Sequence, residues 1–120
     1  MLEVPSVAII DDDEEVRSSL GSLIDSFGYR ATLFLHADDF LASGESGRFA
    51  CIISDIHMPG TSGIQLAATL SRSPERPPLI LVTAYVSPAV ERQAKEAGVL
   101  EVVAKPLDPR ALEGLLRSIL

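Results

Sequence analysis

The chain has 120 residues, a net charge of −7 and one cysteine. This length predicts a single domain over residues 1–120, either complete or cut from a longer protein. One cysteine excludes a disulfide scaffold or a zinc cluster built on cysteines. The negative charge disfavours direct binding to nucleic acid, because phosphate contacts need clustered Lys and Arg. Because there is no apolar run of membrane-spanning length and no leader pattern, we expect a cytoplasmic protein without a membrane partner.

Short apolar runs alternate with stretches of helical spacing along the whole chain. The apolar runs predict five strands, over residues 7–10, 31–35, 51–55, 79–83 and 99–104. Apolar residues at helical spacing follow each strand and predict five helices, marked by residues 16–27, 38–41, 64–70, 90–97 and 112–119. Gly28 is typical of a residue just past a helix end. Ser87-Pro88 and Asp108-Pro109 are typical of a helix cap followed by proline in the first turn.

The alternation of strands and helices indicates the fold class. It implies right-handed crossovers and a doubly wound α/β architecture, in which helices cover both faces of a five-stranded parallel sheet. The runs at 51–54 and 79–82 are apolar at every position but Ser54, as in strands buried between two helical layers. Cys51 lies in such a run and is expected to be a buried structural thiol.

Polar side chains follow the predicted strands at the points where the strands end. Asp11 and Asp12 follow the first strand, Asp55 and Thr83 end the third and fourth, and Lys105 follows the fifth. The carboxyl ends of parallel strands form the ligand crevice of such a sheet. Carboxylates gathered there repel one another unless a cation intervenes, and Mg²⁺ prefers such oxygen ligands. A lysine and a hydroxyl can bind phosphoryl oxygens, so the set indicates phosphoryl transfer.

These motifs, in this order, resemble those of the response-regulator receiver domains of two-component signalling. The resemblance covers essentially the whole chain. It rests on the acidic pair Asp11-Asp12, on Asp55 with Met58-Pro59-Gly60 and Gly63, on Thr83-Ala84, and on Lys105-Pro106. It implies the flavodoxin-like strand order 2-1-3-4-5.

The resemblance also implies a role for each acidic residue. Asp55 would be the phosphoacceptor that takes a phosphoryl group from a sensor histidine kinase or a phosphotransfer protein. Asp12 would bind Mg²⁺ directly, Asp11 would bind it largely through water, and Asp55 and the backbone carbonyl of His57 would complete the protein ligands. The His57 imidazole is expected at the mouth of the site rather than as a catalytic base, and Asp13 is expected to cap the first helix.

The remaining residues of the set would respond to the phosphoryl group. Lys105 would pair with Asp55 when the site is empty and with the phosphoryl group when it is filled, and Thr83 would swing toward the phosphoryl oxygens. Ala84 would keep the approach open, and the Lys105-Pro106 peptide bond would be cis. The protein would then catalyse only its own phosphorylation and dephosphorylation, and would not be an enzyme acting on other substrates.

The sequence departs from the family pattern on the predicted output side. In the family, the fourth helix, fifth strand and fifth helix form the surface that switches, and they offer a possible homodimer face. In this chain Val102 stands where receivers usually have an aromatic switch residue, and Leu107 stands where a Phe commonly follows Lys-Pro. A valine cannot make the ring rotation that accompanies threonine movement. Our hypothesis is that a backbone shift of residues 85–88 transmits the movement of Thr83 instead.

Two other functions compete with a phosphorylatable receiver. A small Mg²⁺-dependent phosphatase with an aspartyl-phosphate intermediate would use the same acids, but it would carry a second acid where this chain has His57. A degenerate receiver serving as a docking scaffold is favoured only by Val102. Control of DNA would require a further domain, because this one has no basic face.

Overall fold

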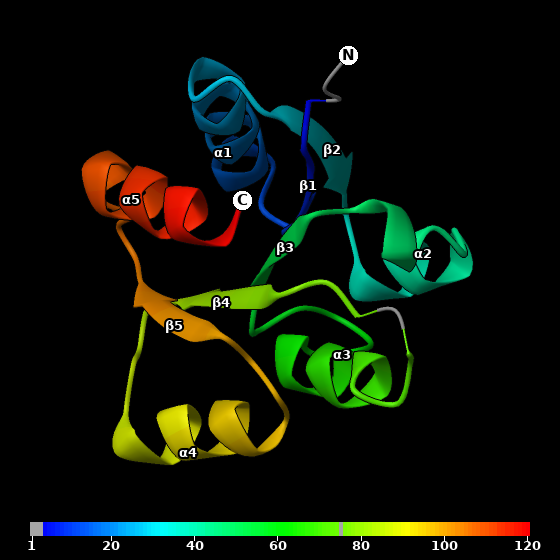
Figure 1. Cartoon of the computed structure of the whole chain (residues 1–120). Coiled ribbons are helices and arrows are strands. Elements are labelled where there is room, and N and C mark those ends of the chain that lie inside the picture. The colour runs from blue at the N-terminus through cyan, green and yellow to red at the C-terminus, as the bar shows by residue number, and fades with distance from the viewer. Residues whose placement is uncertain (1–3, 75) are drawn as a thin grey trace.

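The computed structural model describes residues 4–74 and 76–120. Its five parallel strands form one sheet in the order β2-β1-β3-β4-β5, as expected (Figure 1). The strands are β1 (Ser6–Ile10), β2 (Arg30–Phe34), β3 (Cys51–Asp55), β4 (Leu79–Thr83) and β5 (Glu101–Ala104). The helices are α1 (Glu14–Ser26), α2 (Ala37–Ala42), α3 (Gly63–Leu70), α4 (Pro88–Glu96) and α5 (Pro109–Ile119), with a 3₁₀ turn, η1 (Ser46–Arg48), before β3.

The bounds predicted for β3 and β4 are confirmed, whereas those of the two edge strands, β2 and β5, are displaced. β5 begins at Glu101 rather than residue 99, because the Val99 N–H donates to Ala94 O at 2.9 Å and so closes the end of α4. β2 begins one residue earlier than predicted, because the Arg30 N–H donates to Pro5 O at 2.9 Å.

Local chemistry fixes where the helices begin. The Asp13 carboxylate accepts hydrogen bonds from the Glu15 and Val16 N–H groups, so its predicted capping role is confirmed. Ser87 and Asp108 cap α4 and α5, each followed by proline. Gly28, with φ +92°, follows the end of α1 in the left-handed conformation that glycine adopts most easily.

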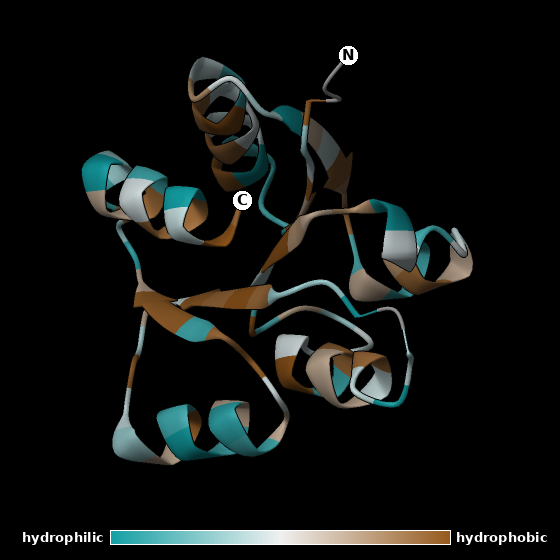
Figure 2. Ribbon diagram, in the orientation of Figure 1, coloured by the Kyte–Doolittle hydropathy of each residue, from teal (hydrophilic) through white to brown (hydrophobic). Residues whose placement is uncertain are grey.

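The helices cover the sheet in two layers (Figure 1). α1 and α5 pack on one face through buried residues such as Ile24 and Leu116. α2, α3 and α4 pack on the other through residues such as Phe40, Leu66 and Ala94. Figure 2 shows apolar colour concentrated on the central strands and polar colour on the outer turns of the helices. Among the described residues no helix has the length and apolar character needed to cross a membrane.

Cys51 is fully buried in the face that α1 and α5 cover. Burial raises the pKa of its thiol to about 12, and a backbone hydrogen bond with Ile52 opposes part of that rise. The thiolate is the reactive form of cysteine. The sequence-based prediction of a buried structural thiol is therefore confirmed.

We expect the folded protein to react with a thiol reagent at about pH 8 on the order of 1000-fold more slowly than a free thiol, because the raised pKa leaves little thiolate. The measurement is the rate of labelling followed by intact mass, with the urea-unfolded chain as the control. Equal rates in the folded and unfolded protein would contradict the burial of Cys51.

Candidate functional site

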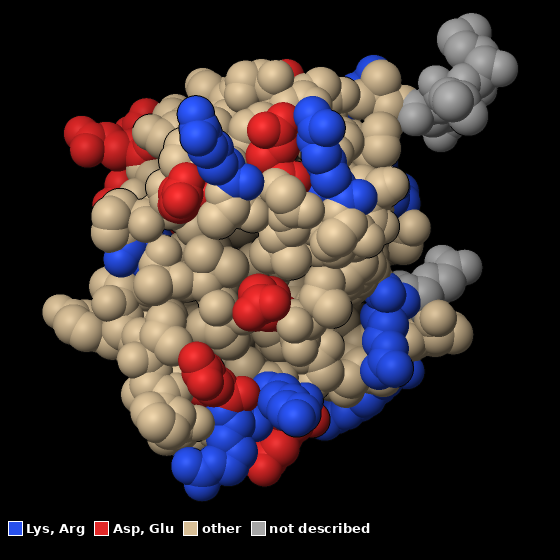
Figure 3. Space-filling view, turned by 60° about the vertical axis from the view of Figure 1, so that its left-hand side comes forward, with Lys and Arg blue, Asp and Glu red and all other residues tan. Residues whose placement is uncertain are grey.

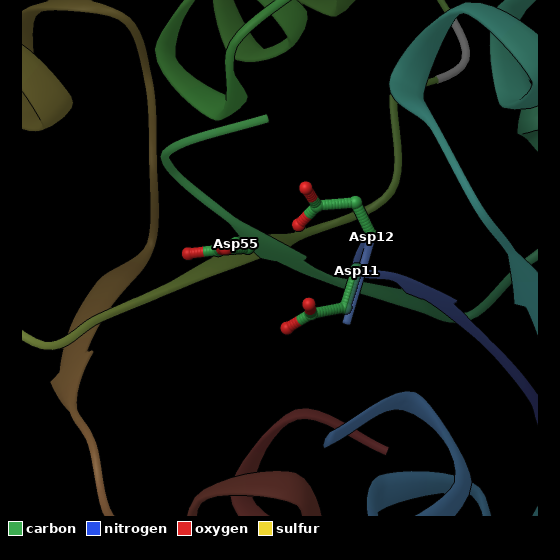
Figure 4. Close-up of side chains that lie close together, drawn as sticks. All are labelled: Asp11, Asp12 and Asp55. Carbon is green, nitrogen blue, oxygen red and sulfur yellow. The ribbon is translucent and has the colours of Figure 1, made fainter. Parts of the chain in front are cut away.

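The acidic residues predicted to converge lie at the carboxyl ends of β1 and β3. These two strands are neighbours, with Ile10 opposite Ser54, so the residues that follow come to the same edge of the sheet. One carboxylate oxygen from each of Asp11, Asp12 and Asp55 lies within 4.8 Å of the others. Figure 4 shows the three side chains directed to the same side of the strand ends. This cluster has the oxygen ligands that a hard divalent cation requires.

Asp11 is buried, with 1% of its surface exposed, and both its carboxylate oxygens and its backbone carbonyl accept hydrogen bonds. Its Oδ1 accepts from the Asp13 N–H at 2.9 Å, and its Oδ2 accepts from Lys105 Nζ at 3.4 Å. The Arg17 guanidinium donates to its backbone carbonyl at 2.8 Å. A buried carboxylate is costly without such partners. Two cations and one backbone N–H thus fix Asp11 at the base of the cluster.

Lys105 joins the two strand ends that carry the acids. Its Nζ lies 3.4 Å from Asp11 Oδ2 and 3.7 Å from Asp55 Oδ2. The pairing with Asp55 expected from the resemblance is present, but the contact with Asp11 is the shorter one. The Lys105 N–H donates to Thr83 O at 2.8 Å, and the Lys105-Pro106 peptide bond is cis, as predicted.

Burial raises the pKa of Asp55, whose side chain is 12% exposed. The Lys105 ammonium opposes this rise, the Asp11 carboxylate adds to it, and backbone N–H groups of Ile56 and His57 oppose it again. The electrostatic cost of ionising Asp55 beside Asp11 is the cost that a bound cation would remove. The residues present therefore fit a divalent metal ion.

Thr83 is fully buried at the end of β4. Its hydroxyl oxygen accepts from the Tyr85 N–H at 3.2 Å, which ties the side chain to the loop that leads into α4. Ala84 is exposed and Tyr85 is 80% exposed, so the loop opens to solvent directly beside the buried hydroxyl. A movement of the Thr83 hydroxyl would remove the partner of the Tyr85 amide.

The loop between β3 and α3, residues 57–62, closes tightly on the end of β3. The Gly63 N–H donates to Ile56 O at 2.9 Å, and Ser62 and Gln65 form a reciprocal cap at the start of α3. A Cβ on Gly63 would lie 2.5 Å from Asp55 O, so only glycine allows this approach. His57, at the start of the loop, has an exposed side chain.

A largely apolar groove of about 1010 Å³ opens beside Lys105. It lies between α1, through residues such as Val16, Ser22 and Leu23, and the segment from Lys105 to Pro109. Lys105 thus lines the groove while its Nζ reaches the acidic cluster. The groove gives the site an apolar flank that the sequence did not predict.

The sequence model of the response regulator receiver domain matches residues 7–117 of this chain. The chain belongs to the response-regulator receiver family. It is 31% identical over 112 residues to the transcriptional regulatory protein FixJ of Bradyrhizobium diazoefficiens, covering 93% of this chain and 55% of that protein. It is also 30% identical over 119 residues to the cyclic di-GMP phosphodiesterase response regulator RpfG of Xanthomonas campestris, covering 96% of this chain and 32% of RpfG.

Solved structures agree with this assignment. The fold is similar to that of the chemotaxis protein CheY4 of Vibrio cholerae, with a TM-score of 0.91 at 24% identity over 98% of this chain and all of that one. The response regulator StyR is similar at a TM-score of 0.88 and 31% identity, over 98% of this chain and 60% of StyR. The chain spans only about half the length of the FixJ relatives, 55% and 57%.

The receiver family acts in two-component signalling, and the sequence-based prediction of this family and fold is confirmed. The structure brings together the predicted Asp11, Asp12, Asp55 and Lys105, and it places Thr83 at the end of the strand next to β3. Sequence reasoning did not assign a role to Arg17. Its position six residues after Asp11, on the first turn of α1, was the only available signal.

Replacing Gly63 with alanine should lower the free energy of unfolding by about 1–3 kcal/mol, because the new Cβ would meet the Asp55 carbonyl and the Leu81 side chain. Urea unfolding followed by circular dichroism measures the change. Gly114→Ala is the matched control, since nothing lies within 4 Å of a Cβ there. That variant should be neutral or more stable by about 0.5–1 kcal/mol. Equal destabilisation by both substitutions would show that the approach at Gly63 is not tight.

Proposed function

We propose that Asp55 is the phosphoacceptor of a receiver that takes its phosphoryl group from a phosphohistidine on a partner kinase or phosphotransfer protein. The observation that carries the proposal is the position of Asp55, which lies at a strand end within an acidic cluster and 3.7 Å from Lys105 Nζ. A carboxylate oxygen of Asp55 attacks phosphorus, the bond from phosphorus to the imidazole nitrogen breaks, and its electron pair returns to the imidazole. The phosphoryl group is then held as a mixed anhydride on Asp55.

Lys105 and Thr83 are the residues placed to stabilise that group. Lys105 already lies near Asp55 Oδ2, so a short movement of its ammonium reaches a phosphoryl oxygen. Thr83 is on the strand next to β3 and would donate its hydroxyl to another oxygen. The Asp11 carboxylate keeps Lys105 within the site when the lysine releases Asp55.

We also propose Mg²⁺ as the cofactor. Asp12 and Asp55 would bind it directly, Asp11 would act mainly through water because Lys105 and Asp13 already occupy its oxygens, and the His57 carbonyl would be a further ligand. When bound, Mg²⁺ would neutralise charge on the transferring phosphoryl group. The proximity of the three carboxylates supports this ligand set.

The histidine-bearing partner would dock across the groove between α1 and the segment from Lys105 to Pro109. That groove reaches Lys105, and its apolar lining suits contact with another protein rather than with a charged small substrate. A phosphatase acting on small esters is disfavoured, because the position two residues after Asp55 is the exposed His57 and carries no second acid. The chemistry of the domain would be confined to its own aspartate.

The output would be a change in the surface formed by α4, β5 and α5. Figure 3 shows the side of the molecule on which these elements lie, with acids and bases interspersed. A second copy of the chain is the partner that we propose for this surface, since mixed charges can pair across a two-fold axis. Val102 packs against the core under α4 and has no ring to rotate. A backbone shift of the loop 85–88 would instead transmit the movement of Thr83 to this surface.

Incubating the protein with Mg²⁺ and acetyl phosphate should add one phosphoryl group, because the small donor needs only the acidic cluster and Lys105. Asp55→Asn should add none, since an amide oxygen is too weak a nucleophile. The measurement is intact mass, with a chelator as the control for metal dependence. Repeated turnover of the phosphoester p-nitrophenyl phosphate by the protein would contradict the receiver function and favour the phosphatase.

Beryllofluoride with Mg²⁺ should mimic the phosphoryl group and shift the backbone amide signals of residues 85–87 and of α4 after Pro88. The Tyr85 N–H should shift most, because it loses the Thr83 hydroxyl as its acceptor. Two-dimensional NMR measures these shifts, and Thr83→Ala is the variant in which they should shrink. If the acidic cluster responds but residues 85–87 and α4 do not, the proposed route of output is wrong.

A further inference from the structure

A hydrogen bond between two side chains joins α2 to the loop that leaves Asp55. The Thr61 hydroxyl donates to Asp38 Oδ1 at 2.5 Å, across 23 residues of sequence. Asp38 lies in the first turn of α2, and Thr61 lies in the loop of residues 57–62. Hydroxyl-to-carboxylate bonds of this length are among the stronger hydrogen bonds in proteins. The sequence alone predicted no such contact for either residue.

The other oxygen of Asp38 faces the same loop. Gly60 adopts φ +77°, and a Cβ built on it would collide with Asp38 Oδ2. Gly60 therefore lets the carboxylate approach the loop backbone, besides supplying the positive φ of the turn. Both carboxylate oxygens of Asp38 thus lie against consecutive residues, Gly60 and Thr61.

The α2 side of this contact is anchored in the core, and the loop is held near its two ends, where the His57 N–H bonds to Asp55 and the Ser62 N–H donates to Gln65 Oε1 at 2.8 Å. Ala37 and Phe40, on either side of Asp38, are fully buried and hold α2 to the core. The ends of the loop are fixed by the hydrogen bond from Gly63 to Ile56 and by the packing of Met58 on the core. Asp38 fixes the span between those anchors.

We infer that Asp38 and Thr61 are positioning residues that hold the loop 57–62 so that the His57 carbonyl faces the metal site, and that they thereby set the affinity for Mg²⁺. This inference rests on the Mg²⁺ site proposed above. Mg²⁺ requires nearly octahedral ligand geometry, so a loop that must be ordered on binding lowers its affinity. Neither residue touches the acidic cluster or takes part in phosphoryl transfer.

The test is Mg²⁺ titration of the protein without any phosphodonor, followed by calorimetry and by the backbone amide signals of residues 55–58 and 60–63. Thr61→Val removes the donor without changing charge and should weaken Mg²⁺ binding about fivefold, a modest effect because the bond is accessible to solvent. Thr61→Ser keeps the hydroxyl and should restore wild-type affinity. Urea unfolding of the same samples should show similar stability, since Thr61 lies in a loop.

Asp38 is tested against a neighbour with the same charge. Asp38→Ala and Asp39→Ala each remove one carboxylate from the first turn of α2, but Asp39 faces His36, 3.6 Å from its Nδ1, instead of the loop. Loss of charge alone should weaken Mg²⁺ binding to a similar extent in both variants. Asp38→Ala should weaken it further, and adding Thr61→Val to Asp38→Ala should have no additional effect.

Two results would overturn the inference. Wild-type affinity in Thr61→Val would show that the hydrogen bond does not position the loop. Equal affinities for Asp38→Ala and Asp39→Ala would show that Asp38 acts by charge alone. If the wild-type protein itself binds no Mg²⁺, the proposed metal site fails and this inference fails with it, which distinguishes that case from failure in the variants only.

Discussion

The repulsion among Asp11, Asp12 and Asp55 is the constraint on which the rest of the site depends. Their oxygens lie within 4.8 Å of one another, and Asp11 is almost fully buried. Lys105, which follows the edge strand β5, offsets part of this repulsion by contacting two of the three carboxylates. One lysine cannot neutralise three acids. The remaining negative charge is the feature of the cluster that fits a divalent cation and, on the proposed function, a metal-bound phosphoryl group.

The parallel sheet supplies this arrangement without any special loop. β1 and β3 are neighbours, so both acidic ends meet at one edge, and β4 and β5 bring Thr83 and Lys105 to the same edge. Strands β3 and β4 could be bounded from sequence because they are buried on both faces, and every residue in them except Ser54, Asp55 and Thr83 is apolar. β2 and β5 are edge strands with half-exposed patterns. The start of β2 is set by a hydrogen bond to the distant Pro5, and the start of β5 is set by the bond from Val99 to Ala94 that closes α4, and composition encodes neither.

The difference between features that local sequence encodes and features that arise from packing also separates the predicted part of the site from the part that was missed. Carboxylates, a hydroxyl and a lysine at strand ends are unusual in sequence, and their chemistry alone indicates a phosphoryl site. Arg17, Asp38 and Thr61 are ordinary polar residues in a helix or loop. Their roles arise from approaches made by folding: a guanidinium reaching the Asp11 carbonyl, and a hydroxyl reaching a carboxylate 23 residues away. Such contacts become visible only when the elements have been packed.

The structure also separates the residues of the chemistry from those of the response. The strand ends that hold Asp11 and Asp55 are buried and tightly hydrogen-bonded, so on the proposed function we expect them to change little when charge is added to Asp55. The loop after Thr83 is exposed, and its Tyr85 amide is bound to the hydroxyl that a phosphoryl group would attract. With Val102 in place of an aromatic switch, β5 has no ring at that position to rotate. On the proposed function, the exposed loop after Thr83 is the neighbour of the phosphorylated aspartate that is held by the fewest buried contacts, and the signal would leave the site through it.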